Sequence, residues 1–305
     1  VNWPPFDGND PTRPSGPRVQ GLCRRLGYQE DEAFGPFPGL PKAVPFSITS
    51  PNGTVRGIRV TPTKISHRVL YLHGQGGNVG VLHRCWLYDV LVEDPLCCEV
   101  IAIDYCGCGY SDFCHPSEAT AVADVLATLE QSGSPSEEVI LWGHSLGTGI
   151  ALSALTKLLQ NGQICKGLVL EAPFLSLPFA AASLVTPQRW PDFRQGLSKR
   201  LFTLMGPHLQ FNSASNILQV AEKMQVIILH GEQDNKVPFE QGHRLAEIGH
   251  VPLRSFMCSH NDIAKQAELG PFLCETFNAW AGAKKRGVSI NVKCCLTWMC
   301  LRLNE

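Results

Sequence analysis

The sequence predicts an α/β protein built on a doubly wound, mostly parallel sheet. Short apolar runs rich in β-branched residues recur along the chain, and helical segments separate them. The runs lack polar alternation, which is typical of strands buried on both faces of a parallel sheet. They lie at 69–72, 100–103, 139–142, 168–170 and 226–229, with a weaker one at 253–257. Strand–helix–strand repetition implies right-handed crossovers between neighbouring strands.

Composition limits the classes of protein that this chain can be. Of 305 residues, 44% are hydrophobic and 17% charged, which excludes a disordered chain. The 26 basic and 27 acidic residues nearly balance, so no overall field attracts nucleic acid, and we expect no nucleic-acid partner. Thirteen cysteines, an odd number with adjacent pairs, indicate reduced thiols in a reducing compartment rather than a disulfide framework. No apolar run approaches the ~18 residues that span a bilayer.

The other elements follow from turn and cap signals. Runs at 44–48 and 55–60 flank Asn52-Gly53 and predict an antiparallel hairpin, which we favour over a glycosylation sequon at the same asparagine. Ser117 predicts a helix start. Further helices are expected at 146–159, 239–248 and 263–280, the last interrupted at Gly270-Pro271 and capped by Asn261 or Asp262. The long apolar stretch at about 174–224 predicts an inserted helical cap over the carboxyl edge of the sheet, with a decorated crossover as the alternative.

The strongest chemical signal is Gly143-His144-Ser145-Leu146-Gly147, between a strand and a helix. This G-x-S-x-G pattern in a strand–turn–helix context predicts a nucleophile elbow, in which a sharp turn exposes the serine hydroxyl. The two glycines leave room for the close approach of strand and helix. Ser145 is therefore the predicted nucleophile.

A serine needs a base, and the base needs an orienting acid, in the chain order Ser, Asp or Glu, His. Asp234 follows the strand at 226–229 and is the predicted acid. Glu232, closer to that strand, and Glu171, after the preceding strand, are alternatives.

His260 is the predicted base because it follows the last strand and precedes a helix. His250 lies before that strand, and His243 falls within a helix. The oxyanion requires two backbone N–H groups. Leu146 supplies one, and Gln75, in the glycine-rich loop after the first parallel strand, supplies the other. That loop has neither nucleotide-binding glycine pattern, so we expect no nucleotide, other cofactor or metal.

With these residues located, the sequence resembles the α/β-hydrolase superfamily. The matching stretches are residues 73–77, 104–111, 142–149, 171–174 and 230–239. Trp-Gly-His-Ser-Leu-Gly-Thr-Gly at 142–149 and Glu-Ala-Pro-Phe at 171–174 are similar to the abhydrolase domain-containing protein 12 branch. That branch holds lysophosphatidylserine and monoacylglycerol lipases, with depalmitoylating relatives in the abhydrolase domain-containing 17 group.

The resemblance implies one α/β-hydrolase domain over residues 44–282. A Pro/Gly-rich leader at 1–43 precedes it, and a Cys-rich tail of unassigned role at 283–305 follows it. The branch carries an amino-terminal membrane helix, which would lie upstream of Val1. Cys106 and Cys108 stand where the family usually has arginine and a bulky residue, and this leaves the headgroup preference open.

These residues predict a serine hydrolase of esters or thioesters that acts through an acyl-enzyme. The apolar cap favours lipid substrates such as monoacylglycerol or lysophospholipid, with peripheral membrane association possible through the tail. The alternatives are a depalmitoylating thioesterase, an S33-type peptidase and an inactive scaffold on the same fold.

Overall fold

A computed structural model describes residues 43–76, 78–185, 196–198, 200–201, 203 and 210–286. Within these residues, eight strands form one sheet in the order β1-β2-β4-β3-β5-β6-β7-β8. The strands are β1 (Ala43–Ser50), β2 (Gly53–Val60), β3 (His67–Leu72), β4 (Cys98–Asp104), β5 (Val139–His144), β6 (Gly167–Glu171), β7 (Val226–Gly231) and β8 (Leu253–Phe256). The pairs β1–β2 and β2–β4 are antiparallel, and all other pairs are parallel. The predicted mostly parallel sheet is confirmed.

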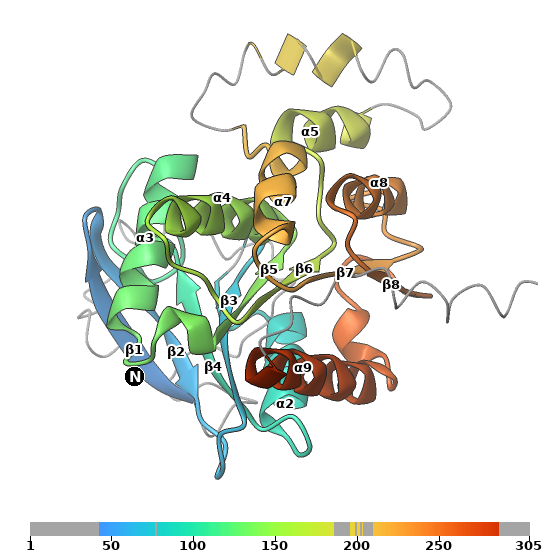
Figure 1. Cartoon of the computed structure of the whole chain (residues 1–305). Helices are drawn as coiled ribbons and strands as arrows, with labels where there is room; N and C mark the ends of the chain where they lie inside the picture. Colours follow the sequence, from blue (N-terminus) through green and yellow to red (C-terminus); the bar gives the residue numbers. More distant parts are fainter. Residues whose placement is uncertain are drawn as a thin grey trace, which may run out of the picture.

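Helices cover both faces of this sheet, as Figure 1 shows. One face packs on α3 (Glu118–Gln131), α4 (Leu146–Gln160), α7 (Ser213–Ala221) and α8 (Phe239–Gly249), and the other on α2 (Leu82–Val92) and α9 (Leu269–Arg286). Within β3, Leu70 and Leu72 belong to the first core cluster, whereas Val69 and Tyr71 belong to the second. Because successive strand residues point to opposite faces and both faces are covered, the four positions 69–72 are all apolar.

The predicted hairpin and the first predicted helix cap are both present. Ser50 pairs with Gly53, so Pro51-Asn52 forms a two-residue turn. The side-chain nitrogen of Asn52 donates to the Thr120 carbonyl and to Asp124, at 3.0 and 2.9 Å. The amide of Asn52 is thus engaged inside the fold, as expected of a turn residue. The cap of α3 is Ser117, whose hydroxyl accepts from the N–H three residues ahead.

The final helix differs from the prediction. A 3₁₀ turn covers Ile263–Lys265, and α9 begins only at Leu269 and runs to Arg286, past the predicted domain end at 282. Pro271 lies in the first turn of α9, where its missing N–H costs nothing, so it starts the helix instead of interrupting it. Asp262 does not cap α9; its carboxylate contacts Lys265 at 2.7 Å.

The predicted cap at about 174–224 is described in part. Its first helix, α5 (Leu177–Val185), lies beyond α7 and α8 in Figure 1. Its last helix, α7, contacts α4 and α8 and contributes Ile217 and Val220 to the core, so it is a crossover helix between β6 and β7. The segments 186–195 and 204–209 lie outside the described residues, as do the leader before Ala43 and the tail after Arg286.

Within the described part of the chain, no helix combines the length and the hydropathy needed to cross a membrane.

Candidate active site

Ser145 sits at the sharp turn between β5 and α4. Its backbone has φ 51° and ψ −117°, a strained conformation outside the helical and extended regions. Its N–H donates to the Glu171 carbonyl at 2.8 Å, which ties the turn to the end of the neighbouring strand β6. The side chain lies at the amino end of α4, where the helix dipole favours negative charge.

Gly143 and Gly147 are required because α4 approaches the sheet closely at the elbow. A Cβ on Gly147 would lie 2.0 Å from the Leu72 carbonyl oxygen, and one on Gly143 would lie 2.4 Å from the Gly147 oxygen. Any side chain at these positions would push α4 away from the sheet. Close packing of helix and strand therefore explains both glycines.

Asp234 and His260 meet at the same edge of the sheet. Asp234 comes three residues after β7, and His260 four residues after β8. His260 Nδ1 donates to Asp234 Oδ2 at 2.6 Å, and the aspartate side chain is fully buried. The other oxygen, Oδ1, accepts from the backbone N–H groups of Lys236 and Val237 at 2.8 and 2.9 Å. The structure thus joins the predicted acid and the predicted base directly.

Hydrogen bonds decide the charge of Asp234. Burial raises the pKa of its carboxyl, but hydrogen bonds from His230 and His260, the charge of His260 and the Val237 N–H outweigh burial and hold the pKa well below its usual range. The carboxylate therefore stays ionised at neutral pH. An ionised acceptor keeps the proton of His260 on Nδ1 and leaves Nε2 free as a base.

The alternative residues serve elsewhere. Glu171 accepts from Trp142 Nε1 at 2.8 Å, and burial raises its pKa to about 7. Glu232 accepts from Ser255 at 2.7 Å in an exposed position. Neither carboxylate bonds to His260. Of the alternative bases, His250 ends α8 in the left-handed conformation, and His243 is exposed beside Glu247.

His144 connects the elbow to the base. Its Nε2 donates to the main-chain oxygen of His260 at 3.3 Å, and the two rings lie 5.0 Å apart. Because His144 is the residue before Ser145, this contact places the elbow next to the loop that carries His260. No hydrogen bond joins Ser145 Oγ to the His260 ring within the described residues, so that contact belongs to the proposal below; such bonds are often loose before substrate binds.

The loop after β3 closes on the elbow. A Cβ on Gly74 would lie 2.9 Å from Cβ of Ser145, so only glycine fits between them. Gln75, the predicted oxyanion donor, is the next residue, and Leu146, the other donor, opens α4. The predicted oxyanion residues thus lie on the two segments that meet at Ser145.

Sequence reasoning assigned no role to several residues around this site. His83 of α2 packs edge-on against His144 with ring centroids 5.6 Å apart. His230 lies 3.4 Å from Asp234 Oδ2 and supports the acid. Arg84 is buried against the loop after β3.

Helix α2 itself was not predicted, because no side chain caps it and because polar His83 and Arg84 interrupt its apolar periodicity.

The buried histidines predict acid sensitivity of the fold. Burial, followed by the charges of Arg84 and His260, lowers the pKa of His83 to about 3, and burial holds the pKa of His144 well below its usual range. Below pH 6.5 each of these histidines therefore binds a proton in the unfolded chain and not in the folded chain, so each lowers stability as the pH falls. For His83 this costs about 2 kcal/mol at pH 5. Glu171 acts in the opposite direction, because its raised pKa lets the folded chain take up a proton near pH 7. Asp234 adds nothing in this window, since its lowered pKa matters only below about pH 4.

A His83→Gln variant tests this directly by thermal unfolding at pH 7 and pH 5. We expect its Tm to fall by roughly 5 °C less than that of the wild type over this range. His243→Gln, at an exposed site, is the matched control and should follow the wild type. An equal fall in all three proteins would contradict the role of His83.

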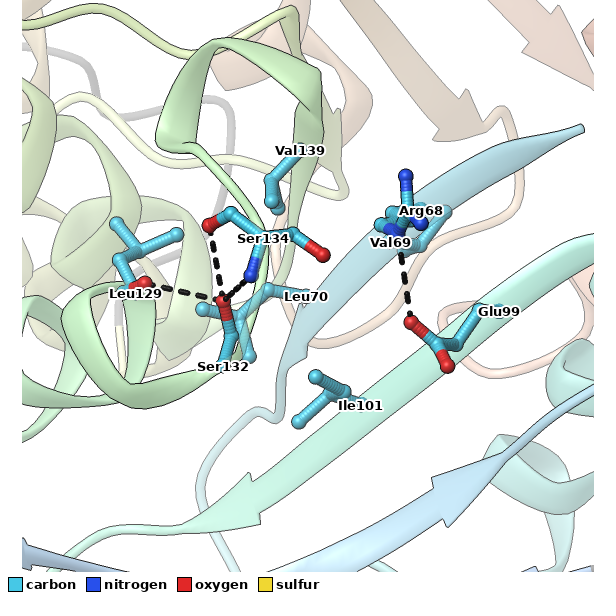
Figure 2. Close-up of a pocket in the computed structure, with 9 residues that line it drawn as sticks. All are labelled: Arg68, Val69, Leu70, Glu99, Ile101, Leu129, Ser132, Ser134 and Val139. Atoms are coloured by element: carbon cyan, nitrogen blue, oxygen red, sulfur yellow. Dashed lines mark hydrogen bonds and ion pairs between the residues drawn. The ribbon is translucent and has the colours of Figure 1, made fainter. Parts of the chain in front are cut away.

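Figure 2 shows a pocket at the opposite edge of the sheet. Its lining includes Arg68 near the start of β3 and Val139 at the start of β5. The other lining residues are Val69, Leu70, Glu99, Ile101, Leu129, Ser132 and Ser134. Parallel strands begin at this edge, whereas Ser145 follows the carboxyl end of β5. The pocket contains no predicted site residue and is separate from the candidate active site.

Comparison with known proteins agrees with this fold. The family model described as "alpha/beta hydrolase fold" matches residues 67–214. The lysophosphatidylserine lipase ABHD12 of Bos taurus is 34% identical over 193 residues, which is 62% of this chain and 46% of that protein. Protein ABHD12B of Homo sapiens is 31% identical over 189 residues, 61% of this chain and 51% of that protein. The matches thus span about half the length of these relatives.

Solved structures show the same architecture. An α/β hydrolase from Vibrio vulnificus superposes with a TM-score of 0.63 and 19% identity, covering 92% of this chain and 98% of that one. The Pyrococcus furiosus esterase Pf2001 superposes with a TM-score of 0.59 and 17% identity, covering 82% and 95%. At these identities the likeness concerns the fold. The chain therefore has the α/β-hydrolase fold, and its sequence is similar to the ABHD12 branch.

Proposed function

We propose that the protein is a serine hydrolase that cleaves carboxylic esters of lipids through an acyl-enzyme. The observation that carries this proposal is the 2.6 Å bond between Asp234 and His260, beside the strained turn at Ser145. A serine hydroxyl is activated by a neighbouring histidine whose Nδ1 is hydrogen-bonded to a buried, ionised carboxylate. Asp234 and His260 form such a pair, and Ser145 lies at the turn of the nucleophile elbow.

In this mechanism Ser145 Oγ attacks the acyl carbonyl while His260 Nε2 takes its proton. Asp234 stabilises the imidazolium that forms. The N–H groups of Gln75 and Leu146 hold the developing oxyanion, with the amino end of α4 adding favourable field. His260 then returns the proton to the leaving alcohol, and water, activated by the same base, releases the acid.

Three features support a lipid as the substrate. Helix α5 has the sequence Leu-Pro-Phe-Ala-Ala-Ala-Ser-Leu-Val, without a single charge, and it follows β6 at the carboxyl edge of the sheet. An apolar helix that follows this edge suits a substrate with an acyl chain better than a peptide. The relative in Bos taurus is named a lysophosphatidylserine lipase. Near-neutral net charge is compatible with a lipid substrate.

A substrate panel tests this proposal. The purified chain would be given monoacylglycerol, lysophosphatidylserine, a palmitoyl-thioester peptide and an amino-terminal prolyl anilide. We expect turnover of the oxygen esters, with Ser145→Ala as the blank. Turnover of the thioester alone would favour the depalmitoylating alternative, and cleavage of the prolyl anilide alone would favour a peptidase. No turnover of any substrate would favour an inactive scaffold, and each of these three results contradicts the proposal.

A further inference from the structure

Arg84 is a buried cation directed at one loop. It belongs to the first turn of α2 and is 2% exposed. Its guanidinium donates to three carbonyl oxygens of the loop between β3 and α2. Nη2 reaches the oxygen of Gly76 at 2.8 Å and that of Gly74 at 3.3 Å, and Nη1 reaches the oxygen of Asn78.

No carboxylate pairs with Arg84 at ion-pair distance within the described part of the chain. Burying a guanidinium without a salt bridge is unfavourable unless other acceptors satisfy it. Here three acceptors are backbone carbonyls, and all three come from residues 74–78. Nε has no hydrogen-bond partner among the described residues. The planar fork of arginine can bind several oxygens in fixed directions, which a lysine ammonium cannot reproduce. The side chain therefore holds the shape of this loop.

The orientation of one peptide group in the loop matters most. In a planar trans peptide the C=O and the following N–H point in opposite directions. The oxygen of Gly74 accepts from Arg84 and lies 2.7 Å from His73 Nδ1. The N–H of Gln75 therefore points away from Arg84. Gly74 lies against Ser145, so fixing this peptide fixes the N–H that we propose as an oxyanion donor.

We infer that Arg84 is the positioning residue of the oxyanion loop, and that its charge also strengthens the N–H of Gln75 as a donor. The carbonyl of the Gly74–Gln75 peptide is polarised by the guanidinium, and hydrogen-bonded groups in a chain reinforce one another at low dielectric. The inference rests on the proposed serine hydrolase function. Arg84 itself touches no reacting atom; it acts through the peptide group that does.

Arg84→Met tests the inference in the intact chain. We expect kcat for an acyl ester to fall about 10²-fold, as for loss of one oxyanion donor, with KM changed less than threefold. Binding of a trifluoromethyl ketone, whose adduct with serine carries an oxyanion, should weaken by a similar factor. Arg59→Met is the matched control, because Arg59 also donates to a carbonyl, that of Ser132, far from the elbow. Its kinetics should match those of the wild type.

Further measurements separate the possible outcomes. If circular dichroism shows that Arg84→Met does not fold, Arg84→Lys decides, with an expected tenfold or greater loss of kcat at unchanged KM. A folded Arg84 variant with kcat and ketone affinity within threefold of the wild type would overturn the role of Arg84. An equal loss of kcat and ketone affinity in Arg59→Met would also overturn the role of Arg84. Absence of turnover in the wild type would instead overturn the proposed function on which the inference rests.

Discussion

Replacement of Ser145 by alanine is expected to lower kcat/KM for an acyl ester by about 10⁶-fold and to abolish labelling by a fluorophosphonate probe. The variant removes the oxygen that would form the acyl-enzyme, while His260 and Asp234 keep their bond at 2.6 Å. The strained backbone conformation at position 145 should cost the same with alanine as with serine, since both residues carry a Cβ. The fold and the Tm should therefore change little.

Ser153→Ala is the matched control for this experiment. Ser153 lies in the same helix, α4, and its hydroxyl contacts Glu118 at 2.6 Å, away from the elbow. Labelling and turnover should persist in this variant. Probe labelling that persists in Ser145→Ala at the wild-type level would assign the nucleophile to another residue.

The second large effect is expected for Asp234→Asn, with kcat lowered about 10⁴-fold. Oδ1 of Asp234 accepts two backbone N–H groups, from Lys236 and Val237, so the carbonyl oxygen of asparagine would keep that position. Its NH₂ group would then face Nδ1 of His260. A donor there forces the proton of the ring onto Nε2, where the base must be free to accept the proton of Ser145.

Glu232→Gln is the control for the acid, because Glu232 is exposed and contacts Ser255 instead of His260. It should retain wild-type kcat, as measured under saturating ester. If Asp234→Asn kept more than a tenth of the activity, or if Glu232→Gln lost as much, the acid would have to be reassigned. Circular dichroism on each variant separates loss of chemistry from loss of fold.

Much of the architecture could be predicted from local sequence. The apolar runs at 69–72 and 139–142 became central strands, because burial on both faces leaves no polar alternation. The turn at Ser145 was predictable because two glycines at fixed spacing serve one steric purpose. Helix α2 could not be predicted, since its buried Arg84 has the sequence signature of a solvent-facing position.

The order of residues along the chain could not by itself identify the acid that orients His260. Asp234 and Glu232 follow β7, and Glu171 is the last residue of β6, so all three lie at the same edge of the sheet. Only the three-dimensional arrangement separates them: one bonds to His260, one faces solvent and one is held by Trp142. Glu232 and Asp234 lie only two residues apart in one loop, and spacing along an irregular loop does not show where each side chain points.

The sequence by itself determined the sheet, the elbow and the candidate residues, because these depend on periodicity and on short motifs with local steric causes. Tertiary structure alone decided that His260 bonds to Asp234 and to neither glutamate, that the rings of His144 and His83 pack beside them, and that Arg84 bonds to the loop of Gln75. These are contacts between residues far apart in the chain. Their energies come from burial and from hydrogen-bond direction, and neither is encoded in local spacing.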